Sequence, residues 1–114
     1  MPYISVTTSL KPSGEQMLRV KSELGRLIGL VPGKTEENLM IDLAASRSMF
    51  KAGEAVACAF VEAKLWGKVE AGAKKRFVEE VLAMLRRELG LEERNLFLNL
   101  LELDEWGSGG TLKG

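Results

Sequence analysis

Apolar residues change their spacing along the chain, and each change predicts a new secondary-structure element. Residues 3–8 (YISVTT) are rich in β-branched and aromatic side chains, which favours a strand. Ser13 and Gln16 then form an S-x-x-Q capping box, typical of a helix start. The apolar face of this helix recurs every three or four residues: Met17, Val20, Leu24, Leu27, Ile28 and Val31. We expect the helix to end near Gly29.

Two further strands are predicted after this helix. Residues 38–46 (NLMIDLAAS) follow a Pro-Gly turn and have the apolar density of a strand covered on both faces. Residues 47–54 are expected to form a loop with a short extended piece. Residues 55–64 (AVACAFVEAK) predict the third main strand, which a turn at Gly67 closes.

Helical spacing returns in the last part of the chain. Residues 69–89 carry apolar side chains at helical period, and Gly90 is a natural carboxyl-terminal cap. Residues 95–103 (NLFLNLLEL) predict a fourth apolar strand. The remaining residues, 104–114, are expected to be a flexible glycine-rich tail.

The two halves of the chain repeat one another. Residues 36–43 (EENLMIDL) and 93–100 (ERNLFLNL) are identical at four of eight positions. A repeated β-α-β unit, at about 2–46 and 55–103, predicts one α/β (α+β sandwich) domain over 1–114: β-α-β-β-α-β, with a four-stranded mixed sheet and both helices on one face. The other sheet face would remain apolar, and further copies of the chain are the simplest cover for it.

Composition removes several classes of function. Sixteen basic and sixteen acidic side chains cancel, so no net field favours nucleic acid or an anionic membrane as a partner. Cys58 is the one cysteine and there is no histidine, so we expect no metal site, dithiol or cofactor. Because the chain has neither a signal-peptide pattern nor about eighteen consecutive apolar residues, we expect a cytoplasmic protein.

The chemistry that remains lies at the amino terminus. Without histidine, a serine or cysteine nucleophile lacks its usual base. If Met1 is removed, Pro2 carries a secondary amine, and α-amino groups have a pKa of about 7.7 to 8.0 that apolar surroundings and a nearby cation lower. The proline ring also fixes the nitrogen at the start of the strand. Lys34 is the natural cation to hold a substrate carboxylate beside it.

Four stretches resemble the macrophage migration inhibitory factor family of the tautomerase superfamily. They are Pro2 at a strand start, the Gly33-Lys34 turn, residues 65–68 (LWGK) and residues 95–99 (NLFLN). The similarity covers nearly the whole chain. It implies a homotrimer whose sheets form a central barrel, with active sites at the subunit interfaces. It also implies tautomerisation of phenylpyruvate and related α-keto acids, with the amino-terminal proline as base.

The resemblance assigns roles to single residues of this chain. Pro2 would be the general base, and Lys34 would bind the substrate carboxylate. Trp66 occupies the position whose backbone amide contacts the substrate, and Asn99 matches a polar residue that the neighbouring subunit supplies. For Lys34, Trp66 and Asn99 the alternatives are a solvated turn lysine, a core or interface aromatic and a side chain that satisfies a strand edge.

Three further aromatic residues are expected at the pocket wall. Phe97 stands where the best-known members of the family have a tyrosine, so it keeps an aromatic wall without the hydroxyl. Tyr3 and Trp106 are the other two. The CxxC motif of the family is absent, because the matching residues 57–60 read ACAF, and no thiol oxidoreductase activity is expected.

The sequence therefore predicts an isomerase, a keto–enol tautomerase acting on an α-keto acid with an aromatic or other apolar side chain. A second hypothesis is a cytokine-like signalling or host-modulating protein, released without a signal peptide, whose receptor leaves no readable motif. The third is hydrolytic dehalogenation of a small unsaturated acid. It ranks lowest, because it needs extra pocket arginines and neither Arg47, Arg76 nor Arg94 has an expected place there.

Overall fold

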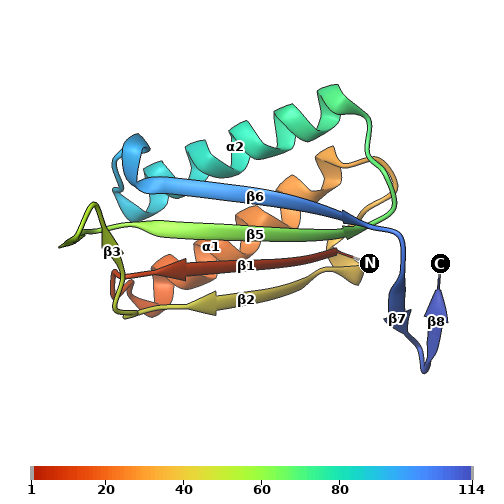
Figure 1. Cartoon of the computed structure of the whole chain (residues 1–114), viewed down its shortest axis with the longest axis horizontal. Coiled ribbons are helices and arrows are strands. Elements are labelled where there is room, and N and C mark those ends of the chain that lie inside the picture. The colour runs from red at the N-terminus through yellow and green to blue at the C-terminus, as the bar shows by residue number, and fades with distance from the viewer. Residues whose placement is uncertain (1, 114) are drawn as a thin grey trace.

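Two β-α-β units lie side by side in one four-stranded sheet (Figure 1). In the computed structural model, which describes residues 2–113, β1 (Pro2–Thr8) pairs in parallel with β2 (Met40–Ala44). β5 (Ala59–Trp66) pairs in parallel with β6 (Leu96–Leu103), and β1 and β5 pair antiparallel at the centre. The strand order β2-β1-β5-β6 confirms the predicted repeat and mixed sheet.

The first helix begins and ends where local sequence signals place it. α1 (Gly14–Leu27) starts at the predicted capping box: Ser13 Oγ accepts a hydrogen bond from the Gln16 N–H, and Gln16 Oε1 accepts one from the Ser13 N–H. The last turn tightens into a 3₁₀ segment, η1 (Ile28–Leu30), so the helical region ends near Gly29 as expected.

The second helix covers the same face of the sheet as the first (Figure 1). Glu70 caps the amino terminus of α2 (Ala71–Leu89), and its carboxylate accepts hydrogen bonds from the backbone N–H groups of Gly72 and Ala73. These bonds lower the pKa of Glu70. The helix ends at Gly90, which has a left-handed φ of 66°, and this confirms the predicted cap.

The core lies between the helices and the face of the sheet that they cover. Residues alternate along β1 and β5 between buried and partly exposed positions, as a half-covered strand requires. The buried side chains of the strands meet those of the helices in one cluster, which includes Ile4, Val6, Val61, Leu65, Leu24, Leu27, Phe77 and Val81. Burying each large side chain contributes about 1.5 to 3 kcal/mol, so this cluster is the main source of stability.

Two strands, β2 and β5, have boundaries that differ from the prediction by two residues or more. Residues 36–38 form a 3₁₀ turn, η2 (Glu36–Asn38), so β2 is shorter than expected. Residues 55–58 do not belong to the third main strand, because Phe50–Lys51 (β3) and Glu54–Ala55 (β4) pair with each other as a small hairpin. Ser9 then holds the following residues in a loop: its hydroxyl donates to the Val56 carbonyl and accepts from the Cys58 N–H.

The expectation of a flexible tail after β6 is also wrong. Trp106–Ser108 (β7) and Thr111–Lys113 (β8) form an antiparallel hairpin. Its turn is made by Gly109 and Gly110, whose φ values of 59° and 79° suit the tight turn that a twisted hairpin needs. The hairpin lies at the end of the sheet where β1 begins (Figure 1).

The second face of the sheet carries no helix (Figure 1). β6 contributes exposed apolar side chains at Phe97, Leu101 and Leu103, whereas β1 contributes Tyr3, Ser5 and Thr7. This open face is therefore mixed in polarity. The expectation that β2 is covered on both faces is wrong for the single chain, because Met40 is 67% exposed. Within residues 2–113, no helix has the length and apolar character needed to cross a membrane.

Candidate active site

Pro2 is the first residue of β1 and is fully buried on the side of the sheet that the helices cover. It pairs in register with Leu65 of β5. Proline is tolerated at the first position of a strand because no backbone N–H is needed there. Met1 lies outside the described residues, so its removal stays a prediction.

Lys34 reaches the same end of β1 from the turn before β2. Gly33, with a φ of 79°, allows this turn, and the Lys34 Nζ donates to the Trp66 carbonyl at 3.1 Å. Within a strand, the N–H and C=O of one residue point to one side and those of the next residue to the other. Since the Gly67 N–H bonds to Leu103 on β6, the polar backbone groups of Trp66 point toward β1. The Lys34 ammonium is thus held at the amino end of β1.

The turn after Trp66 is fixed from β6. The Glu102 carboxylate accepts a hydrogen bond from the Val69 N–H at 2.6 Å and from the Lys74 Nζ at 2.8 Å. These bonds, the Lys74 bond foremost, lower the pKa of Glu102. The Trp66 indole N–H donates to the Asp104 carbonyl at 3.0 Å. The backbone of Trp66 is therefore anchored on both sides of its contact with Lys34.

A cavity of about 440 Å³ opens beside Pro2. It brings together three of the sequence-predicted site residues, Pro2, Tyr3 and Trp106, with residues that sequence reasoning did not select. The full lining is Pro2, Tyr3, Asn38, Met40, Lys64, Trp106, Gly107 and Ser108. The volume is in the range of small-molecule sites.

Tyr3 and Lys64 form one wall of this cavity. Lys64 faces Tyr3 across the β1–β5 pair, and its Nζ lies 5.5 Å from the centre of the Tyr3 ring. The Tyr3 hydroxyl donates to Asp42 Oδ2 at 3.1 Å. Burial and this carboxylate both raise the pKa of Tyr3, burial being the larger cause. The phenol therefore stays protonated at neutral pH and serves as a wall and a donor.

Two sequence-predicted residues lie away from Pro2 within the chain. Phe97 pairs with Phe60, five residues before Leu65 on β5, so it is about 16 Å along the sheet from the level of Pro2. Its ring stacks on Phe60 at 6.3 Å, and the Lys51 ammonium lies 5.6 Å from it. Asn99 is exposed on β6 opposite Glu62. A single chain does not bring either residue to the cavity.

Five lining residues escaped the sequence analysis: Asn38, Met40, Lys64, Gly107 and Ser108. Strand alternation was a usable signal for Lys64, since it lies two residues before Trp66 on the same face of β5. The other four depend on the η2 turn and the β7–β8 hairpin, which the sequence did not reveal. Among residues 2–113, no three Cys, Asp or Glu side chains are grouped as metal ligands.

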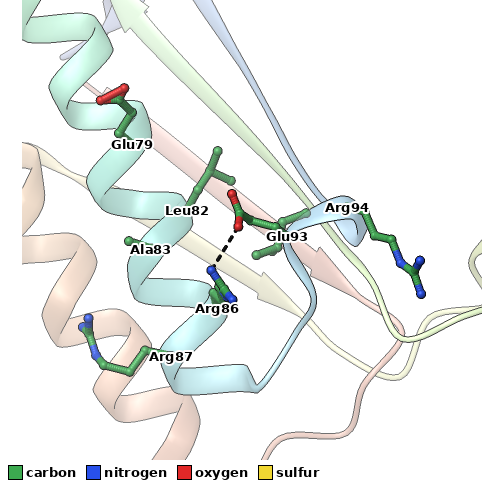
Figure 2. A pocket seen from close by; sticks show the side chains of 8 residues that line it. Glu79, Leu82, Ala83, Arg86, Arg87, Glu93 and Arg94 are labelled. Carbon is green, nitrogen blue, oxygen red and sulfur yellow. Dashed lines mark hydrogen bonds and ion pairs between the residues drawn. The ribbon is translucent and has the colours of Figure 1, made fainter.

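A larger groove of about 830 Å³ lies at the opposite end of the sheet, between the last turns of α2 and the start of β6 (Figure 2). Arg86 pairs with Glu93 at 3.0 Å, as the dashed line shows, and Arg94 pairs with Glu92 at 2.7 Å. In each of these exposed pairs the two charges compensate one another. Basic residues near a helix carboxyl terminus also interact favourably with the helix dipole. Within the described residues, neither Arg47, Arg76 nor Arg94 lines the Pro2 cavity.

Solved structures of the same fold come from distant organisms. MIF2 of Leishmania major superposes with a TM-score of 0.89 at 18% identity, covering 99% of this chain and 97% of that one. A macrophage migration inhibitory factor-like protein of Entamoeba histolytica gives 0.84 at 20% identity, covering 98% of each chain. Pt0534, inactivated by 2-oxo-3-pentynoate, gives 0.85 at 11% identity, covering 95% of this chain and 93% of that one.

Sequence comparison identifies the family. No curated protein matches the chain. The family model described as macrophage migration inhibitory factor (MIF) matches residues 1–112, which is nearly the whole length. Together with the shared fold, this match shows that the chain belongs to the macrophage migration inhibitory factor family, within the tautomerase superfamily.

Proposed function

We propose that the chain is a keto–enol tautomerase in which Pro2, after removal of Met1, is the general base. One observation carries the proposal: the first residue of β1 borders a cavity, and the Lys34 ammonium is held at the same strand end through Trp66. Members of this superfamily are generally isomerases, which agrees with the proposed reaction class.

The environment of Pro2 favours a neutral amine at its nitrogen. The Pro2 side chain is fully buried, and its partner on β5 is the apolar Leu65. Apolar surroundings and a nearby ammonium group both disfavour a second positive charge. A neutral amine fixed by the proline ring can accept a proton without a search for the right orientation.

The proposed reaction needs no cofactor. Lys34 binds the carboxylate of the α-keto acid, so that the carbon beside the keto group faces Pro2. Pro2 takes a proton from this carbon, the C–H electron pair forms the enol double bond, and the keto oxygen gains the negative charge. The Trp66 N–H, which points toward the amino end of β1, and donors that line the cavity stabilise this oxygen. Pro2 then returns the proton to the oxygen, so atoms and charge balance.

The remaining pocket residues require a neighbouring subunit under this proposal. Homologues in the family are typically oligomeric and bind small-molecule substrates. In a trimer, Phe97 and Asn99 of one subunit would complete the cavity of the next. The exposed apolar residues of the open face, among them Phe60 and Leu101, favour such an assembly, because soluble monomers rarely leave large apolar patches uncovered.

Covalent labelling tests the proposed base directly. Inactivation of Pt0534 by 2-oxo-3-pentynoate makes this 2-oxo acid the natural probe. A free amine adds to its triple bond, forming one C–N bond while the proton moves to carbon, so the whole reagent mass is gained. We expect intact-mass analysis to show a chain beginning at Pro2, with the label on the amino-terminal peptide. Retention of Met1, or a label on Cys58 alone, would contradict the proposal.

A further inference from the structure

Lys64 is a cation at the Pro2 cavity for which the proposed reaction has no role. It lines the cavity from β5, on the same face as Tyr3. Among residues 2–113 it forms no ion pair, and its Nζ lies over the Tyr3 ring, 5.5 Å from the ring centre. An aromatic face stabilises an ammonium group and leaves its charge uncompensated.

The carboxylates nearest to Lys64 on this face, Asp42 and Glu62, form no ion pair with it. Asp42 accepts the hydrogen bond of the Tyr3 hydroxyl. Glu62 lies two residues earlier on β5, about 7 Å along the strand, and does not pair with Lys64. Lys34, held at the Trp66 carbonyl, lies at the same end of β1 but is not among the residues that line the cavity. This end of the sheet therefore carries two ammonium groups, and a substrate with one carboxylate would compensate only one of them.

Ser108 provides an independent sign of a polar ligand. It lines the same cavity from the β7–β8 hairpin, and its hydroxyl oxygen is buried without a hydrogen-bond partner among the described residues. Buried hydroxyl groups nearly always have a partner, because an unsatisfied one destabilises the folded state. Rotation of this side chain into the cavity would let an oxygen atom of a bound ligand satisfy the hydroxyl.

We propose that the substrate is an α-keto dicarboxylic acid, an inference that rests on the proposed function. Lys34 binds the carboxylate beside the keto group, and Lys64 and Ser108 bind the second carboxylate at the far end of the side chain. Both are specificity-determining residues. The cavity of about 440 Å³ is large enough for a molecule of this class. This assignment replaces the aromatic or apolar side chain expected from the family resemblance.

A selectivity measurement tests the assignment. The enol forms of oxaloacetate, with two carboxylates, and phenylpyruvate, with one, are compared by kcat/KM in the wild type, Lys64→Gln, Lys64→Arg and Ser108→Ala. We expect the ratio favouring oxaloacetate to fall at least about tenfold in Lys64→Gln, as the loss of a charge-assisted hydrogen bond implies. Lys64→Arg should retain most of the preference, and Ser108→Ala should lose part of it. Lys21→Gln, on the exposed face of α1, should match the wild type.

Binding without reaction separates this inference from the proposed function. Glutarate has two carboxylates and butyrate has one. Neither has a keto group to enolise, so calorimetry with these acids measures recognition alone. The wild type should bind glutarate more tightly, and Lys64→Gln should lose that difference. If the chain converts neither enol but shows this binding pattern, the tautomerase proposal fails and the dicarboxylate site stands. An unchanged selectivity ratio in Lys64→Gln together with equal binding of the two acids overturns the dicarboxylate assignment.

Discussion

The ammonium group of Lys34 donates a hydrogen bond to the backbone carbonyl of Trp66, 3.1 Å away, although 32 positions separate the two residues. The contact joins the turn before β2 to the last residue of β5. β1 lies between these strands, so the contact spans the strand end at which Pro2 is found. The strand order of the sheet therefore brings the proposed base, Pro2, and the residue proposed to bind the substrate carboxylate, Lys34, to the same end of β1.

Replacing Lys34 should weaken substrate binding more than it slows conversion. Lys34→Ala removes the cation that pairs with the substrate carboxylate, and we expect kcat/KM for phenylpyruvate enol to fall about 10- to 100-fold, mainly through KM. Initial-rate kinetics give the split. Lys21→Ala, at an exposed position of α1, is the matched control. A KM for Lys34→Ala equal to that of the wild type would show that Lys34 does not bind the substrate.

The Glu102 contacts should make stability depend on acid pH. The folded-state pKa of Glu102 is lower than its ordinary value of about 4.5, so the carboxylate stabilises the fold above that pH. This contribution is lost as the pH falls from about 4.5 through the lower folded-state value. Glu102→Gln should therefore have a lower Tm than the wild type at pH 7, and the two should converge in strong acid. Thermal melts followed by circular dichroism at both pH values measure this, and a Tm difference that persists unchanged in acid would contradict it.

Two leucines on α1 give a matched test of the core. Leu24 is fully buried and Leu18 is 66% exposed. Leu24→Ala should lower the free energy of unfolding by about 3 to 5 kcal/mol, because it removes buried methyl groups and leaves a cavity. Leu18→Ala should change it by less than about 0.5 kcal/mol. Urea denaturation compares them, and similar losses in both would contradict the assigned packing of α1.

Self-association through the open sheet face is tested at Leu101. Leu101→Glu places a charge on the apolar part of this face. If the chain forms the proposed trimer, we expect this variant to sediment as a monomer at equilibrium. Leu18→Glu, on the outer surface of α1, should leave the trimer intact. A wild-type chain that sediments as a monomer at assay concentration would show that the open face is not the contact surface.

Local signals in the sequence predicted much of the fold. The capping box at Ser13, the Gly90 cap and the internal repeat each act over a few residues or a fixed spacing, and all three agree with the structure. The β7–β8 hairpin was missed because its strands have three residues each, too few to show an apolar period. Three of the eight lining residues reach the cavity through that hairpin; Trp106 was expected there from the family resemblance, whereas Gly107 and Ser108 were not.

Sequence reasoning selected Lys34 as a candidate site residue and did not select Lys64. Lys34 follows a Pro-Gly turn, whose sharp reversal marks it in the sequence. Lys64 lies within a strand. Alternation along that strand predicts which face of the sheet its side chain is on, but not which residue of the neighbouring strand it faces. Its position against Tyr3 depends on the register between β1 and β5, which only the folded sheet defines.

The central claim is that the Pro2 amine carries out proton transfer. The most direct measurement is the rate at which the ultraviolet absorbance of phenylpyruvate enol disappears with wild type, Pro2→Ala, a form that retains Met1, and Pro12→Ala as the control proline. The account predicts acceleration by the wild type and Pro12→Ala, and a loss of at least about a hundredfold in the other two forms. Equal rates in all four would contradict it.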